Sequence, residues 1–287
     1  MLLKPFSFYL PKSLNEASQL YASLPETRII AGGTFLLNSL KALKRRELKT
    51  PQNVISLNKI GELKGIFLEG DVLIIKAMTS INELFDSPLL KDNFKVLRTV
   101  CRNISTNPIR NMATVGGNLS CRYTWTEMGA VMIALDATLH FRKPDGEEEI
   151  ISAEDFFKSG AKTNKILTHV TIKRDPTATI AYRRVRKTMH VDVPLLAVCV
   201  KTNFKAERFS HTRVTVNNGV AFAQRDRILE DFLNQSFCYP EIAKEALDHL
   251  DLNIYDKRSD DYKKYMFRVS LKNAIQELIK NQPKPIR

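Results

Sequence analysis

The chain has 287 residues, of which 44% are hydrophobic and 26% are charged, which suits a soluble globular protein with a real core and two or three lobes. No apolar run approaches the ~20 residues of a membrane span. The first residues turn polar too quickly for a secretion signal, so we expect a cytoplasmic protein without a membrane span.

The net charge is +13, from 44 basic and 31 acidic residues. An excess of this size points to nucleic acid, an acidic partner subunit or an anionic ligand. The basic residues are dispersed, with local density at 41–49 and 183–187, and they form neither an RNA-recognition pattern nor a zinc-finger spacing. We therefore predict no nucleic-acid partner, although the charge alone keeps that alternative open.

Residues that could bind metal or act as nucleophiles show no informative spacing. Four cysteines are scattered along the chain and are expected to be reduced thiols: Cys101, Cys121, Cys199 and Cys238. Four of the five histidines likewise lack ligand spacing: His140, His169, His190 and His211. No Ser-His-Asp or Cys-His arrangement is visible, so we predict neither a metal site nor a catalytic residue on this chain.

Residues 1–57 are expected to form a small α/β lobe. Ser13 is a predicted N-cap, and Glu16 three positions later completes a capping box for the helix that follows. The next elements are a buried strand over 28–31, a helix over 35–49 and a strand over 53–57. That second helix is expected to turn four leucines inward: Leu36, Leu37, Leu40 and Leu43.

Residues 58–174 are expected to form a second lobe. It begins with a hairpin over 66–75, and Pro108 is expected to end helical conformation before a turn at Arg110–Leu119. Helices are predicted from Ser80, over 94–104 and over 128–135, and strands over 137–141 and 169–172. From about residue 175 the pattern predicts strands over 180–182, 195–200 and 209–216, then helices over 228–233, 242–250 and 262–279.

Two stretches contain adjacent glycines. The first glycine motif, residues 31–35, reads as a strand end, a turn and a helix start, and the second, residues 114–118, holds Gly116 and Gly117. A glycine pair exposes backbone N–H groups, and such turns bind anions. Thr114 adds a hydroxyl and Asn118 an amide. Two such motifs could hold the two phosphates of a dinucleotide, but each also fits an ordinary structural turn, and neither matches the dinucleotide or P-loop pattern.

Ala31-Gly32-Gly33-Thr34 together with Ile109–Leu119 resembles the FAD-binding medium subunit of molybdenum hydroxylases, of the xanthine dehydrogenase and carbon monoxide dehydrogenase type. Both motifs occur in the family's order and at about its spacing. The resemblance implies an α+β fold, with a two-lobed FAD-binding domain of the vanillyl-alcohol oxidase-like (PCMH) type at 1–174, its lobes at about 1–57 and 58–174. A small C-terminal α+β domain with a three-stranded antiparallel sheet would follow at 175–287.

The resemblance also implies a function for the bound FAD, because the cofactor carries the redox chemistry and the protein binds and orients it. Electrons would arrive from iron–sulfur clusters of a 2Fe-2S small subunit, after hydroxylation on a molybdopterin-binding large subunit, and leave for NAD or another acceptor. The implied FAD contacts are Ala31, Gly32, Gly33, Thr34, Phe35, Thr114, Gly116, Gly117, Asn118, Glu127, Arg183 and Arg184.

Three of these residues have a second interpretation. Glu127 stands where the family carries an acidic residue near the ribitol or ribose, and it is equally a glutamate favoured at a helix N-terminus. The run Tyr182–Lys187 resembles the family's aromatic–basic run, in which a cation near the flavin stabilises the anionic reduced form. Arg183 or Arg184 is the candidate, and a solvated basic strand end is the alternative.

The sequence departs from the family pattern at both motifs. Phe35 stands where many relatives have an acidic or polar residue, and residues 121–127 read Cys-Arg-Tyr-Thr-Trp-Thr-Glu where many have Ala-Ser-Pro-x-x-Asp. Tyr123 or Trp125 would stack on an adenine or flavin ring, or serve packing alone. These departures motivate an alternative function, a non-catalytic binding or assembly module of the same fold that has lost flavin.

Overall fold

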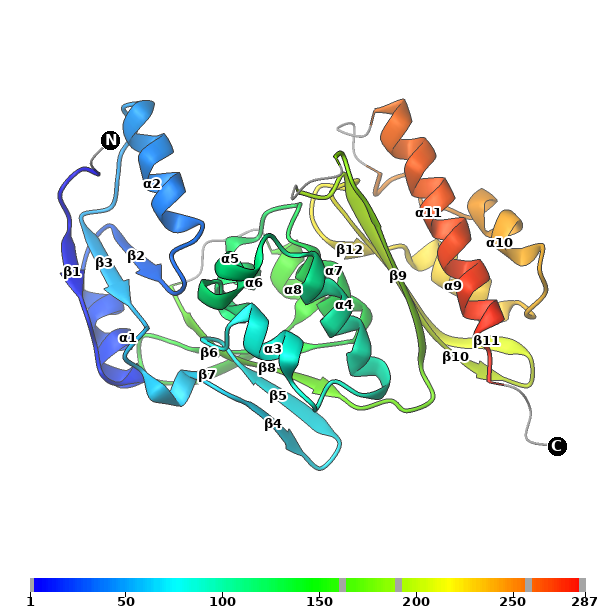
Figure 1. Ribbon diagram of the computed structural model, residues 1–287, viewed down its shortest axis with the longest axis horizontal. Helices are drawn as coiled ribbons and strands as arrows, with labels where there is room; N and C mark the ends of the chain where they lie inside the picture. The colour runs from blue at the N-terminus through cyan, green and yellow to red at the C-terminus, as the bar shows by residue number, and fades with distance from the viewer. Residues whose placement is uncertain (1–2, 160–163, 189–192, 256–259, 284–287) are drawn as a thin grey trace.

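A computed structural model describes residues 3–159, 164–188, 193–255 and 260–283, and their strands form three sheets that follow one another along the chain (Figure 1). The boundaries predicted between lobes and domains, near residues 57 and 174, fall between these sheets. His190 lies outside the described residues.

The first lobe contains β1 (Ser7–Tyr9), α1 (Leu14–Ser23), β2 (Thr27–Ile30), α2 (Leu36–Arg45) and β3 (Asn53–Ser56). Its sheet is parallel with the order β1-β3-β2, and Leu14 and Ala17 of α1 are buried in one cluster with Ile55 of β3. The predicted cap is present, since the Ser13 hydroxyl accepts the Glu16 N–H at 3.2 Å. The capping box is incomplete, because the Glu16 carboxylate accepts the N–H of Lys12 instead of that of Ser13.

Helix α2 differs from its prediction in length and in burial. It ends at Arg45 rather than Lys49, and Glu47 follows with a left-handed φ of 56°. Of the four leucines expected to face inward, Leu40 is buried, whereas Leu37 is 38% exposed. The reason is position, since α2 stands away from the other helices at the edge of the molecule (Figure 1). Helical periodicity therefore located the apolar face of α2 but not what covers it.

The second lobe is built on a five-stranded antiparallel sheet. Its elements are β4 (Ile66–Glu69), β5 (Val72–Lys76), α3 (Ile81–Asp86), α4 (Lys95–Asn103), α5 (Asn107–Met112), α6 (Val115–Cys121), α7 (Glu127–Ala134), β6 (Thr138–Arg142), β7 (Glu148–Ser152), α8 (Ala153–Lys158) and β8 (Ile166–Lys173), with 3-10 turns at Gly61–Leu63 and Asp92–Phe94. The strand order is β4-β5-β8-β6-β7. Alternate residues such as Leu139, Phe141 and Val170 are buried in one core with residues of the helices, and the residues between them form the opposite face.

Two predictions for the second lobe were wrong. Pro108 does not end helical structure but lies in the first turn of α5, where the missing N–H of proline is tolerated. The predicted turn at Arg110–Leu119 is instead a short break between two helices, with Thr114 as the N-cap of α6. Gly116 and Gly117 therefore lie in the first turn of a helix.

The C-terminal part contains β9 (Thr179–Val185), β10 (Leu196–Lys205), β11 (Arg208–Asn217), β12 (Gln224–Arg225), α9 (Arg227–Gln235), α10 (Ile242–Glu245), a 3-10 turn at Ala246–Asp248 and α11 (Asp261–Lys280). The three predicted strands form an antiparallel sheet, to which the two-residue β12 adds a fourth. Strand β10 is buried from Leu196 to Thr202. It is covered on both faces, because α11 packs on one side and α7 of the second lobe on the other (Figure 1).

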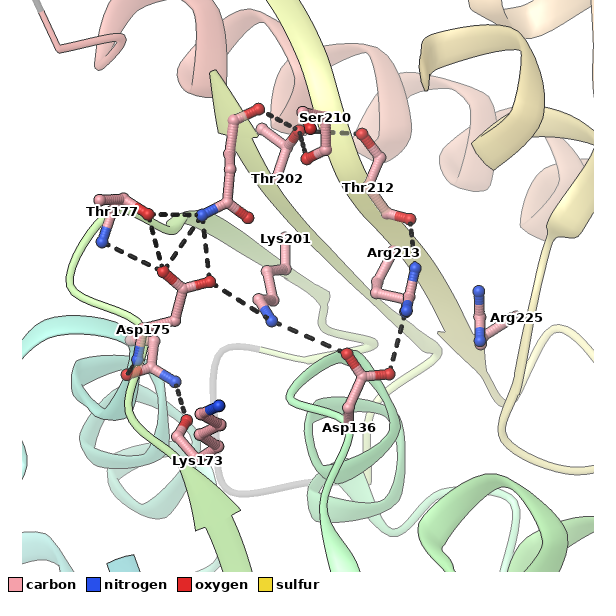
Figure 2. A network of polar contacts seen from close by, with 12 residues as sticks. Asp136, Lys173, Asp175, Thr177, Lys201, Thr202, Ser210, Thr212, Arg213 and Arg225 are labelled. Carbon is pink, nitrogen blue, oxygen red and sulfur yellow. Dashed lines mark hydrogen bonds and ion pairs between the residues drawn. The ribbon is translucent and has the colours of Figure 1, made fainter. Parts of the chain in front are cut away.

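Polar contacts fix the C-terminal sheet against the second lobe. The Thr215 hydroxyl donates to the Ala130 carbonyl at 2.9 Å, inside α7. Figure 2 shows the buried Lys201 ammonium between two carboxylates, Asp136 and Asp175, with 3.8 Å to each. Arg213 adds a 2.9 Å hydrogen bond to Asp136. These contacts place β10 and β11 beside α7, the helix that follows the second glycine motif.

Candidate functional site

The two glycine motifs, far apart in the sequence, lie against each other. A Cβ atom placed on Gly32 would be 1.9 Å from the carbonyl oxygen of Met112, which lies two residues before the second motif. A Cβ atom on Gly117 would be 3.6 Å from the Cβ of Ala31. The backbones therefore approach so closely that Gly32 leaves no space for a side chain. This contact joins the first lobe to the second.

The first motif offers free backbone donors. Gly33 has a left-handed φ of 70°, which allows the chain to turn sharply after β2. Within the described part of the chain, the N–H groups of Gly32, Gly33, Thr34 and Phe35 donate no hydrogen bond. Consecutive unpaired N–H groups around a left-handed residue form a concavity that binds anions such as phosphate. The first motif therefore has backbone donors available for an anion, and its role in cofactor binding stays a prediction.

The second motif uses its backbone differently. The Gly116 N–H donates to the Ala77 carbonyl at 2.8 Å, and the Gly117 N–H donates to the Thr114 hydroxyl at 3.1 Å. A Cβ on Gly116 would be 2.6 Å from the Cβ of Ala77. This glycine is needed for close packing, and the two N–H groups expected to meet a phosphate already have partners. Sequence reasoning missed Ala77, because nothing near residue 77 signals a contact with the motif.

Asn118 is the residue of the second motif that remains available. Its side-chain Oδ1 atom is buried and has no hydrogen-bond partner among the described residues. A buried amide oxygen without a partner is rare, because its desolvation is not compensated. A ligand that donates a hydrogen bond at this position would satisfy it.

Three aromatic rings connect the two motifs. The ring centroid of Phe35 is 4.6 Å from that of Tyr123, and the Tyr123 ring stacks on Trp125 at 4.2 Å with 22° between the planes. Phe35 belongs to the first motif and the other two follow the second. Tyr123 is 38% exposed, so this cluster forms part of the surface. The departures from the family pattern therefore lie together in space.

Glu127 and Arg184 form an ion pair with each other, with side-chain exposures of 3% and 7%. Burial raises the pKa of Glu127, and the charge of Arg184 opposes that rise. The buried Tyr182 hydroxyl is close by, and its pKa is raised well above the usual range by burial and then by the charge of Glu127. The pair joins the start of α7 to β9. Two residues that the sequence predicted as separate cofactor contacts therefore contact each other.

Arg183 lies on the other face of β9 and forms an ion pair with Glu277 of α11. It also lines a cleft of about 530 Å³, together with Asp92 and Tyr182. No residue of either glycine motif lines this cleft. Because neighbouring residues on a strand point to opposite faces, Arg183 and Arg184 cannot both face the glycine motifs. The structure brings Arg184, and not Arg183, into contact with Glu127.

A dinucleotide with a pyrophosphate fits these residues. The N–H groups of Gly32 to Phe35 would donate hydrogen bonds to the pyrophosphate, and the buried Asn118 oxygen, which lacks a partner among the described residues, would accept one from the cofactor. In the described residues no helix is long and apolar enough to cross a membrane.

Comparisons with known proteins agree with this fit. Residues 4–174 match the family described as the FAD binding domain in molybdopterin dehydrogenase. The chain is 27% identical over 286 residues to the carbon monoxide dehydrogenase medium chain of Hydrogenophaga pseudoflava, covering 96% of this chain and 97% of that one. It is 29% identical over 196 residues to the nicotinate dehydrogenase FAD-subunit of Eubacterium barkeri, covering 64% of each chain.

A solved structure extends the likeness to the whole fold. It is carbon monoxide dehydrogenase from Hydrogenophaga pseudoflava lacking the Mo-pyranopterin moiety of the molybdenum cofactor, with a TM-score of 0.89 and 26% identity over 99% of this chain and 100% of that one. The chain therefore belongs to the family of FAD-binding domains of molybdopterin dehydrogenases. It is an FAD-binding oxidoreductase subunit of the molybdenum hydroxylase type, and the predicted cofactor and fold class are confirmed.

Proposed function

We propose that this chain is the electron-transfer flavoprotein subunit of a molybdenum hydroxylase complex and that FAD binds where its two glycine motifs meet. The observation that carries the proposal is the contact of Gly32 with Met112 and of Gly117 with Ala31, which sets the first motif against the start of α6. In the described chain the N–H groups of the first motif and the Asn118 oxygen of α6 have no hydrogen-bond partner. When bound, FAD supplies the redox chemistry that links one-electron carriers to a final acceptor.

The residues of this chain have distinct roles in the proposed site. The N–H groups from Gly32 to Phe35 hold the pyrophosphate, and Asn118 accepts a hydrogen bond from a hydroxyl of the cofactor. Thr114 fixes the start of α6 by capping it. The buried pair of Glu127 and Arg184 holds α7 against β9, so we assign Arg184 rather than Arg183 to the flavin side.

The partners belong to the proposal as well. Its relatives are named as medium chains or FAD subunits, which supports a complex with a molybdopterin-binding large subunit and a 2Fe-2S small subunit. NAD or another molecule is the electron acceptor in this proposal. The net charge of +13 favours acidic surfaces on those partners. All four cysteines are free thiols, as in a reducing compartment such as the cytoplasm.

A second candidate function rests on the aromatic cluster of Phe35, Tyr123 and Trp125. These rings lie beside both motifs, at the positions where the sequence departs from the expected family pattern. If the rings occupy the cofactor's place, the chain is a binding or assembly module without flavin. If the cofactor displaces one ring or stacks on it, the cluster is a wall of the FAD site.

Titration of the purified full chain with FAD, followed by calorimetry and visible absorption, separates the two functions. The proposal expects saturable binding that weakens in Asn118→Ala and is unchanged in Asn58→Ala, an exposed asparagine shortly after β3. A triple variant, Phe35→Ser, Tyr123→Ser and Trp125→Ala, decides the alternative. No binding by the native chain, alone or with its partner subunits, but binding by the triple variant would establish the module.

A further inference from the structure

The face of the five-stranded sheet opposite its buried core carries two histidines and a glutamate from three adjacent strands. His140 of β6 and His169 of β8 are directly opposite each other in the antiparallel register, and Glu148 lies on β7. One ligand atom from each residue lies within 4.8 Å of the other two. We propose that these three side chains bind a divalent transition-metal ion of the zinc class, at a site separate from the FAD site.

The donor set suits such an ion. Two imidazoles and one carboxylate are a common ligand set for zinc when a water molecule occupies the fourth position. Imidazole nitrogen also suits copper and nickel, whereas calcium and magnesium prefer oxygen ligands alone. The Nδ1 atom of His140 is 3.1 Å from a carboxylate oxygen of Glu148, a separation that two ligands of one metal ion also have.

Neighbouring hydroxyl groups orient both imidazoles. The Nε2 atom of His140 is 3.0 Å from the Thr171 hydroxyl, and the Nδ1 atom of His169 is 2.9 Å from the Thr168 hydroxyl. Metal-binding histidines usually hydrogen-bond through the ring nitrogen that does not bind the metal. This arrangement leaves Nδ1 of His140 toward Glu148, and Nε2 of His169 without a partner among the described residues.

The protonation state of His169 favours metal binding, whereas the stacking of the two imidazole rings and the charge of Lys76 oppose it. Burial, then the neighbouring His140 and Lys76, lowers the pKa of His169 to about 4, so this imidazole is neutral near pH 7. The rings are stacked with centroids 4.0 Å apart and 14° between their planes, so one ring must rotate for both nitrogens to reach one ion. The ammonium of Lys76, opposite His169 in the sheet, repels a cation.

The location gives the ion a structural consequence. Strand β7 is an edge strand of this sheet, paired on one side by β6. An ion bound to His140, Glu148 and His169 would connect the edge strand to two inner strands. Since an ion that binds the folded chain and not the unfolded one raises stability, the melting temperature should rise with metal concentration.

The test is titration of the tag-free full chain with Co²⁺, whose visible spectrum reports its ligands, followed by displacement with Zn²⁺. We expect one saturable site with nitrogen and oxygen ligands. Its affinity should fall by at least about tenfold in His140→Gln, His169→Gln and Glu148→Gln, and by about tenfold in Thr171→Val. His211→Gln, an exposed histidine elsewhere, is the matched control and should bind as the native chain does.

Two further variants keep the result decisive. Lys76→Gln removes the opposing charge and should tighten binding, which a merely structural effect on the sheet would not do. Glu148→Gln changes an exposed side chain, so it should fold normally. No saturable binding below about 100 µM metal, thiolate charge-transfer bands that indicate a cysteine site, or equal affinity in the native, His169→Gln and Glu148→Gln chains would each overturn the proposal.

Discussion

The two glycine motifs look alike in the sequence and use their glycines for different purposes. In the first motif, Gly33 has a left-handed backbone, and four consecutive N–H groups have no partner in the described chain. In the second motif, Gly116 and Gly117 lie in a helix, their N–H groups are bonded, and Gly116 packs on Ala77. The first motif is a turn with unpaired N–H donors in the described chain, and the second is a helix start whose glycine allows close packing.

The difference teaches that a glycine pair does not by itself identify a phosphate-binding backbone. In this protein the second motif contributes a surface on which the first can rest, together with the side chain of Asn118. Substitutions in the two motifs should therefore affect folding and FAD binding in different proportions.

Gly32→Ala should have the largest effect, because it breaks the contact between the motifs. The added Cβ would lie 1.9 Å from the Met112 oxygen and 2.7 Å from its carbonyl carbon, both backbone atoms. We expect the unfolding free energy to fall by about 3 kcal/mol and FAD affinity by about 100-fold or more. Thermal unfolding and FAD titration measure both. Gly61→Ala is the control, since a Cβ there meets nothing within 4 Å; equal behaviour of the two variants would contradict the contact.

Gly116→Ala should mainly destabilise the fold. Its Cβ would be 2.6 Å from the Ala77 Cβ and 2.8 Å from the Ala77 oxygen. We expect a loss of about 1–2 kcal/mol from overpacking, with FAD affinity reduced less than in Gly32→Ala. Denaturant unfolding measures this loss. The double variant with Ala77→Gly should recover part of it, and a variant as stable as the native chain would refute the packing role.

Asn118→Ala should separate binding from stability. Because the buried Oδ1 atom has no partner in the described chain, its removal should change the unfolding free energy by less than about 0.5 kcal/mol. Loss of one hydrogen bond to the cofactor should weaken FAD binding by about tenfold. Calorimetric titration checks the affinity, and the matched melting curve checks the fold. Unchanged affinity would remove Asn118 from the proposed site.

The smallest change in stability is expected from lowering the pH, which protonates Asp175. This carboxylate belongs to the contacts that hold the C-terminal sheet beside α7. Burial alone raises the pKa of Asp175, but hydrogen bonds from Asn203 and Thr177 and the charge of Lys201 outweigh it and hold the pKa below the ordinary 3.8. An acid with a lowered folded-state pKa stabilises the fold above the ordinary value and loses that effect as pH falls through the folded pKa.

The unfolding free energy of the native chain should therefore decline more steeply below about pH 4 than that of Asp175→Asn. Denaturant unfolding at several pH values measures the two slopes, with Asp145→Asn on an exposed turn as the control. Identical slopes for the native chain and Asp175→Asn would show that this network does not contribute.

Much of the fold could be predicted from local pattern. Ser13 caps α1 as expected, and the sequence pattern located the three long strands of the C-terminal sheet, with alternation as the signal for the strand at 209–216. Errors occurred where a residue type suits two structures. Proline is compatible both with the end of one helix and with the first turn of the next, and Pro108 lies in the first turn of α5.

The candidate site was predicted in its residues more than in its arrangement. The two motifs named by the sequence contact each other, and Glu127 and Arg184 form a separate ion pair. The pairing of Glu127 with Arg184, and the placement of Arg183 on the opposite face of β9, required the direction of each side chain. In a run of adjacent basic residues, the sequence does not show which side chain points inward, because this depends on which face of the strand is packed against other elements.

The sequence by itself determined the family, the cofactor and the two glycine motifs, because these depend on residue types at fixed spacing. The tertiary structure alone decided which glycine frees an N–H group and which makes room for a neighbouring backbone, since Met112 and Ala77 are distant in sequence from the glycines they touch. It also brought His140, Glu148 and His169 together, because strand pairing, and not spacing along the chain, sets the distance between residues in a sheet.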